Sequence, residues 1–133
     1  ADMNRFSREP GADAEGYFTV APSEAAKPSR IKRVEINGEP VILTRIEGEL
    51  CAFSSVCPHS LGDLSGGTIY NGEIDCPVHG WRFDIRSGQA AWPEKEVYKL
   101  TRSQTATNRR HAVKEEGGLI KVKLRPRPGF RPK

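Results

Sequence analysis

Short runs of alternating apolar and polar residues, separated by turn residues, follow one another through positions 17–124. Two Asn-Gly pairs, Asn37-Gly38 and Asn71-Gly72, each stand between two such runs. Asn-Gly in this setting is the strongest short-range signal for a β-hairpin. The strands expected from the pattern are 31–36, 41–43, 50–53, 68–70, 73–75, 81–85, 97–100, 112–114 and 119–124.

No stretch of ten residues has a convincing amphipathic helical pattern, and the 13 glycines and 10 prolines favour turns. We therefore predict an all-β protein. The chain lacks an apolar run of about 18 residues and a signal-peptide pattern at its start. Together with an odd number of cysteines, these features lead us to expect a cytoplasmic protein without a membrane span.

The two ends differ from the body of the chain. Residues 1–15 are polar and aperiodic, which predicts a loose arm, and residues 125–133 form a basic, proline-rich tail. The net charge of +4 comes from the last 13 residues, which hold six basic and no acidic side chains, so the rest carries −2. A basic tail on a near-neutral body is not typical of a nucleic-acid-binding domain. We expect one domain over residues 1–133.

Two Cys–His pairs use most of the scarce metal-binding residues. The chain has three cysteines and three histidines, and two of each lie at Cys57, His59, Cys76 and His79. A thiolate and an imidazole two or three residues apart can face one point from a single loop. Zinc accepts such a ligand set, but its usual spacing pairs Cys with Cys and His with His on separate elements. Here each loop supplies one cysteine and one histidine. This mixed arrangement favours a two-iron cluster with thiolates on one iron and imidazoles on the other.

The motif C-x-H, followed sixteen residues later by C-x-x-H, resembles that of the Rieske [2Fe–2S] proteins. GELCAFSSVCPH and CPVHGWRFDIRSG are similar to the cluster loops of Rieske ferredoxins and oxygenase Rieske domains. The resemblance covers residues 17–124. It implies a Rieske fold, with antiparallel sheets forming a basal barrel-like sandwich and a cluster-binding subdomain at about 54–93. It also implies one [2Fe–2S] cluster per chain, with Cys57 and Cys76 on the inner iron and His59 and His79 on the exposed one.

Four positions place the chain near the low-potential, ferredoxin-like branch of this family. High-potential members resemble C-T-H-L-G-C and C-P-C-H-G-S-x-Y, with a disulfide between the additional cysteines. Gly62 and Val78 occupy those cysteine positions here, and Trp81 and Phe83 replace the Ser and Tyr whose hydroxyls raise the potential. Oxygenase α-subunits add a 2-His-1-carboxylate iron. Only His111 remains for it in this sequence, so we do not expect that site here.

The resemblance implies one-electron transfer from a reductase, such as a flavoprotein, to a terminal redox enzyme, such as an oxygenase. We expect an electron-transfer component and no catalytic residue or small-molecule substrate. Two alternatives stay open. One is a Rieske-like small subunit of a larger redox enzyme such as nitrite reductase, and the other is a structural zinc module that binds a partner. A third role, an iron–sulfur redox sensor that binds nucleic acid, is not supported, because the sequence predicts no recognition helix.

We expect simple structural roles for six further residues. Cys51 has apolar neighbours and is expected to be a small buried side chain. Trp81 and Trp92 are expected to pack against the cluster loops rather than bind a ligand. Asp63 and Asp75 are expected to be solvated carboxylates, with partner docking as the alternative. His111 is expected to be solvated or a local hydrogen bonder.

Overall fold

The computed structural model describes residues 11–57, 62–78, 80–92 and 108–125, and within them the chain is built from β-strands without an α-helix. The strands are β1 (Phe18–Pro22), β2 (Lys32–Ile36), β3 (Glu39–Ile46), β4 (Glu49–Ser54), β5 (Ile69–Tyr70), β6 (Glu73–Asp75), β7 (Arg82–Asp84), β8 (Ala90–Trp92), β9 (Arg110–Glu116) and β10 (Leu119–Lys123). Two single-turn 3₁₀ helices, η1 (Ser23–Ala25) and η2 (Leu64–Gly66), connect strands. The predicted all-β class is confirmed.

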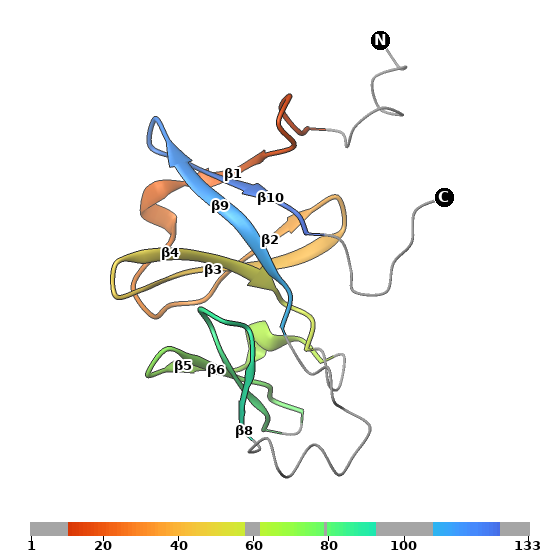
Figure 1. Ribbon diagram of the computed structural model, residues 1–133, viewed down its shortest axis with the longest axis vertical. Helices are drawn as coiled ribbons and strands as arrows, with labels where there is room; N and C mark the ends of the chain where they lie inside the picture. The colour runs from red at the N-terminus through yellow and green to blue at the C-terminus, as the bar shows by residue number, and fades with distance from the viewer. Residues whose placement is uncertain (1–10, 58–61, 79, 93–107, 126–133) are drawn as a thin grey trace.

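Six strands form an antiparallel sheet in the order β1-β10-β9-β4-β3-β2. The sheet curls until its two edge strands, β1 and β2, come near each other, which gives a nearly closed barrel (Figure 1). Val41 and Leu43 of β3 pack inside with Ile120 and Val122 of β10, and all four are fully buried. This barrel is the base of the molecule.

A smaller antiparallel sheet, in the order β5-β6-β7-β8, lies at one end of the barrel (Figure 1, green). Side chains alternate between the two faces of a strand, so Ile42 of β3 and Phe53 of β4 point away from the barrel interior. They join Ile74 of β6 and Phe83 of β7 in a second apolar cluster. The second cluster therefore attaches the small sheet to β3 and β4.

The turns follow the sequence signals closely. Both residues of Asn37-Gly38 have positive φ (51° and 84°), as do both residues of Asn71-Gly72 (53° and 75°). Type I′ hairpin turns require this geometry. The two predicted hairpins, β2–β3 and β5–β6, are confirmed.

Several boundaries differ from the expectation. The last hairpin turns at Gly117-Gly118, so Glu115 and Glu116 belong to β9, where they pair with Arg45 (2.8 Å) and Lys121 (3.1 Å). The expected strands did not include β1 or β8, and the expected strand 97–100 lies outside the described residues. Of the arm expected at 1–15, the described part, 11–15, forms a turn closed by the Asp13 amide and the Tyr17 carbonyl (2.8 Å). Within the described ranges, no helix is long and apolar enough to cross a membrane.

Candidate metal centre

Cys57 begins the first of the two predicted cluster loops, three residues after the end of β4. Its amide donates to the carbonyl of Gly62 (2.8 Å), which closes the base of the loop 57–62. The amide of Leu64 donates to the carbonyl of Ser55 (2.7 Å) just outside that base. Cys57 is fully buried, whereas His59 lies outside the described residues.

Cys76 begins the second loop, directly after β6. Its amide donates to the carbonyl of Trp81 (2.7 Å), and its own carbonyl accepts from the amide of Gly80 (2.8 Å). Gly80 has a φ of +76°, a conformation that residues with a Cβ rarely adopt, so glycine suits this turn. Cys76 is buried, and His79 lies outside the described residues.

The two loops therefore have the same base, a hydrogen bond from the cysteine amide to the carbonyl five residues later. Both cysteines belong to one apolar cluster together with Leu64, Trp81 and Phe83. Burial disfavours the thiolate unless a positive charge compensates it. A pair of buried thiols at the first positions of two equivalent loops suits a positively charged metal centre. The two cysteines of the predicted ligand set thus fit a [2Fe–2S] cluster.

The third cysteine differs in its backbone surroundings. Cys51 is also buried, but it lies inside β4, opposite Thr44 of β3. Burial raises the pKa of its thiol, and nearby Glu49 raises it further. The expected role as a small buried side chain is confirmed. None of the three cysteines forms a disulfide.

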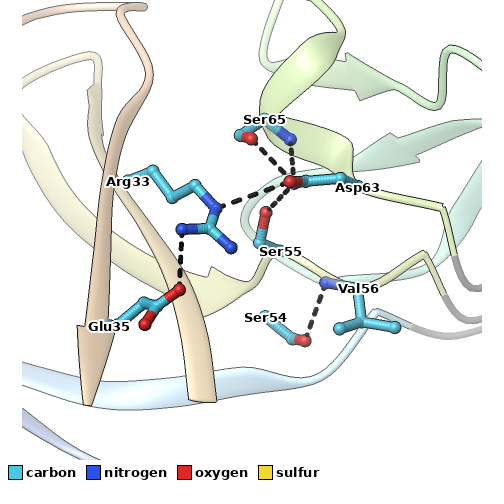
Figure 2. A network of polar contacts seen from close by, with 7 residues as sticks. All are labelled: Arg33, Glu35, Ser54, Ser55, Val56, Asp63 and Ser65. Carbon is cyan, nitrogen blue, oxygen red and sulfur yellow. Dashed lines mark hydrogen bonds and ion pairs between the residues drawn. The ribbon is translucent and has the colours of Figure 1, made fainter. Parts of the chain in front are cut away.

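The Asp63 side chain is 54% exposed, as expected of a solvated carboxylate, but it also accepts several hydrogen bonds. Its Oδ1 accepts hydrogen bonds from the hydroxyl of Ser55 (2.5 Å) and from the amide (2.9 Å) and hydroxyl (2.7 Å) of Ser65, as Figure 2 shows. Its Oδ2 lies 3.5 Å from Nε of Arg33 on β2. Partial burial acts to raise the pKa of Asp63, but these hydrogen bonds and the charge of Arg33 outweigh it, so the pKa is lowered. The sequence signal was Asp-Leu-Ser at a turn, a helix N-cap pattern.

Asp75 connects the start of the second loop to the segment that precedes β5. Its Oδ1 accepts from the amide of Thr68 (2.5 Å), and its own amide donates to the carbonyl of Thr68 (3.1 Å). A Cβ at Gly67 would lie 2.0 Å from the carbonyl oxygen of Asp75, so only glycine fits there. Asp75 immediately precedes Cys76. The expectation of solvated carboxylates at Asp63 and Asp75 overlooked this bonding.

Asn108 connects the barrel to the small sheet, a role that the sequence did not reveal. Its amide donates to the carbonyl of Gly88 (2.6 Å), after β7, and its side-chain Nδ2 donates to the carbonyl of Ser54 (3.1 Å), at the end of β4. Asn108 is buried. It came at the end of a polar segment with no apolar periodicity, which gave no sign of burial.

The aromatic residues divide into one buried pair and one exposed ring. The rings of Trp81 and Phe83 are buried with their centroids 6.2 Å apart, and neither carries a hydroxyl. Trp81 packs in the apolar cluster with both loop cysteines, as expected, whereas Trp92 is 45% exposed and is not among the described residues of that cluster. The guanidinium of Arg82 lies 6.0 Å from the centroid of the Trp92 ring, within reach of a cation–π contact.

His111 is buried in β9, and its Nδ1 accepts a hydrogen bond from the amide of Arg125 (2.9 Å). The expected hydrogen bonding is confirmed, but its partner is 14 residues away and not local, and the alternative of a solvated side chain was wrong. Burial, with the charges of Arg109 and Arg125, lowers the pKa of His111 to about 4. The imidazole is therefore neutral at physiological pH.

Comparison with known proteins points to one family. The model of the Rieske [2Fe–2S] domain matches residues 16–102. The chain is 34% identical over 118 residues to a 4beta-methylsterol monooxygenase of Methylococcus capsulatus, covering 87% of this chain and 32% of that one. It is 31% identical over 91 residues to the ferredoxin component of a naphthalene 1,2-dioxygenase system of Pseudomonas aeruginosa, covering 68% of this chain and 79% of that one.

A solved structure agrees with these sequence matches. The ferredoxin of carbazole 1,9a-dioxygenase from Nocardioides aromaticivorans superposes with a TM-score of 0.67 at 25% identity, covering 82% of this chain and 98% of that one. The chain spans only 20% to 55% of the length of four of the curated relatives that it matches, the Methylococcus monooxygenase among them. The family model, these relatives and the two-sheet fold agree: the chain belongs to the Rieske [2Fe–2S] domain family, whose cofactor is a [2Fe–2S] cluster.

Proposed function

We propose that the protein is a one-electron carrier whose [2Fe–2S] cluster is held by Cys57, His59, Cys76 and His79. The observation that carries this proposal is the arrangement of the two loop cysteines. Both are buried in one apolar cluster, and each begins a loop with the same closing hydrogen bond. The two histidines follow the cysteines by two and three positions.

A Rieske cluster, when bound, accepts and donates one electron at a potential raised by its two histidine ligands. The chain supplies the environment. Cys57 and Cys76 lie in the apolar cluster, away from water, whereas Val78, the residue before His79, is 53% exposed. The second loop therefore runs from the core to the surface. We infer that a redox partner approaches at the histidine end of the loops.

The redox partners proposed for this electron carrier are a flavoprotein reductase as donor and a terminal oxygenase, or a similar redox enzyme, as acceptor. Relatives named as ferredoxin components of dioxygenase systems support this choice. No residue is assigned a catalytic role or a small-molecule substrate. In this proposal the chain is one cytoplasmic domain with its cluster-binding part at about 54–93. The segments 1–15 and 125–133 are its arm and tail.

A second candidate role is the Rieske segment of a longer oxygenase chain. The match to the Methylococcus monooxygenase favours it, because that match covers most of this chain but about a third of the relative. The protein would still pass single electrons, to an iron in a catalytic domain. Reduction of a separately supplied oxygenase by the purified 133-residue protein distinguishes the two roles.

Metal and sulfide analysis after anaerobic purification tests the proposal. We expect two irons and two acid-labile sulfides per chain. Cys57→Ala and Cys76→Ala should each lose the cluster. Cys51→Ala is the matched control, since it removes an equally buried thiol from inside β4 and should keep the cluster. One zinc without sulfide in the wild type would instead support the structural zinc module.

A further inference from the structure

A compact polar network lies beside the base of the first loop. Its centre is Asp63, directly after Gly62, the residue whose carbonyl closes the loop with Cys57. Asp63 pairs with Val56 in an isolated β-bridge. The carboxylate thus lies where the chain leaves the loop, beside the point where it enters. Figure 2 shows it between Ser55, Ser65 and Arg33.

Ser55 makes this network part of the buried framework. It is fully buried, and its amide donates to the carbonyl of Pro40 on β3 (3.0 Å). Its carbonyl accepts from the amide of Leu64, and its hydroxyl donates to Asp63. The Asp63 side chain is 54% exposed, so the hydroxyl of this buried serine bonds to a carboxylate at the surface. Loss of that carboxylate would take away the acceptor that the hydroxyl uses, which is costly where water does not replace it.

Ser65 connects the same carboxylate to η2. Both its amide and its hydroxyl donate to Asp63 Oδ1, which caps the start of this single turn. Leu64, in the same turn, packs in the apolar cluster that holds Cys57 and Cys76. Asp63 therefore connects the segment after β4, the end of the loop 57–62 and the apolar cluster that contains Cys57 and Cys76.

Arg33 contributes less than the two serines. Its contact with Asp63 is 3.5 Å, it also pairs with Glu35 at 3.1 Å, and its side chain is 37% exposed. Exposed ion pairs of this kind stabilise proteins weakly. Hydrogen bonds from buried or capping donors to a carboxylate are stronger. The serine bonds are thus the main part of the network.

We propose that Asp63 is a positioning residue that holds the base of the loop 57–62 closed and thereby fixes Cys57 for the cluster. This inference rests on the proposed function. Asp63 acts through the loop backbone and does not itself bind iron.

The test compares Asp63→Ala and Asp63→Asn with the wild type. The asparagine keeps a side-chain oxygen that can accept from Ser55 and Ser65, whereas alanine removes the acceptor. Three quantities are measured on the purified protein: the half-life of the visible absorbance in excess EDTA, the EPR line of the reduced protein, and amide hydrogen exchange at Cys57. Circular dichroism first establishes that each variant is folded at the temperature used.

Asp13→Ala is the matched control. Asp13 Oδ1 also accepts backbone amides, from Glu15 and Tyr17 at 2.9 Å each, but in the turn before β1. If Asp63→Ala fails to fold, Ser55→Ala removes a single donor from the same network and takes its place.

We expect Asp63→Ala to shorten the half-life about fivefold or more, broaden the EPR line and speed exchange at Cys57. Asp63→Asn should stay within about twofold of the wild type, and Asp13→Ala should match it. The proposal is overturned if Asp63→Ala behaves like the wild type, if Asp63→Asn is as impaired as Asp63→Ala, or if Asp13→Ala is equally impaired. A wild type without a cluster would refute the proposed function, and the exchange at Cys57 would still decide whether Asp63 holds the loop.

Discussion

At the scale of single residues, backbone position and not burial distinguishes the three cysteines. Cys51, Cys57 and Cys76 are all at most 1% exposed. Cys51 lies between paired residues of a long strand, whereas the other two begin loops whose bases are closed by their own amides. Spacing in the sequence selects the same two cysteines, because only they have a histidine two or three positions later.

The residues around the cysteine pair predict a low reduction potential. Trp81 and Phe83 share the apolar cluster with Cys57 and Cys76 and offer no hydroxyl. Donors to cluster sulfur stabilise the reduced state, which carries one more electron, so their absence lowers the potential. We expect a value near the negative end of the range of roughly −150 to +300 mV.

A redox titration of Trp81→Ser/Phe83→Tyr beside the wild type tests this prediction. Two added hydroxyls should raise the potential by about 100–200 mV, given the strength of hydrogen bonds to charged groups. Phe83→Leu, which adds no donor, is the control. A wild-type value above about +100 mV would contradict the low-potential assignment. No upward shift in the double variant would contradict the hydroxyl mechanism.

His111 predicts a dependence of stability on acid pH. Its pKa is about 4 in the folded protein against an ordinary value of 6.5, so the unfolded chain takes up a proton first as the pH falls. Its contribution therefore lowers stability progressively from pH 6.5 towards pH 4. A protonated Nδ1 could no longer accept the hydrogen bond from the amide of Arg125. The charges of Arg109 and Arg125 add to this effect.

The matched variant is His111→Asn, which does not titrate and keeps an amide oxygen as an acceptor. Thermal unfolding is followed at several pH values between 7 and 4. The melting temperature of the wild type should fall more steeply with decreasing pH than that of the variant. Equal pH dependence in the two proteins would show that His111 does not contribute.

At the scale of elements, local signals predicted the hairpins well and the connections between the sheets poorly. The Asn-Gly turns work because positive φ at both positions is a local property of the sequence. The pairing of Asn108 with Gly88 and Ser54 depends on segments far apart in the chain. Asp63 showed a local capping signal, but its bond to Ser55 required the loop to close. Long-range polar contacts of this kind leave little trace in hydrophobic periodicity.

Gly88→Ala tests the connection between the sheets. Gly88 has a φ of +80°, and a Cβ there would lie 2.4 Å from the carbonyl oxygen of Asn108. Gly38 has a similar φ of +84° but no atom within 4 Å of its Cβ position. Gly38→Ala should therefore cost about 1–2 kcal/mol of unfolding free energy from backbone strain alone. Gly88→Ala should cost clearly more in denaturant unfolding, and equal costs would contradict the close contact.

At the scale of the whole molecule, the barrel provides two strands, β3 and β4, that serve two cores. Alternate residues of these strands face the barrel interior and the small sheet that carries the second loop. The resemblance in the sequence implied this division. The shared strands hold the base of the first loop, and Asn108 and Arg86 connect the small sheet to the barrel.

Truncation of the chain tests where the folded body ends. The amide of Arg125 binds His111 in the barrel, while residues 126–133 are proline-rich, basic and without apolar periodicity. Removal of residues 126–133 should leave the melting temperature and visible spectrum unchanged. Removal of residues 125–133 should lower the melting temperature, because His111 loses its donor. Loss of the iron–sulfur cluster after removal of residues 126–133 would contradict the prediction that the folded body ends at Arg125.

Pulsed EPR of the reduced, anaerobically purified protein measures the ligand set most directly, because it detects nitrogen nuclei bound to the paramagnetic cluster. We expect strong couplings to two histidine nitrogens. One of them should be lost, together with cluster stability, in each of His59→Cys and His79→Cys. His111→Asn should retain both couplings. A spectrum without strongly coupled nitrogen, or both couplings retained in either cysteine variant, would contradict the assignment of Cys57, His59, Cys76 and His79 as the cluster ligands.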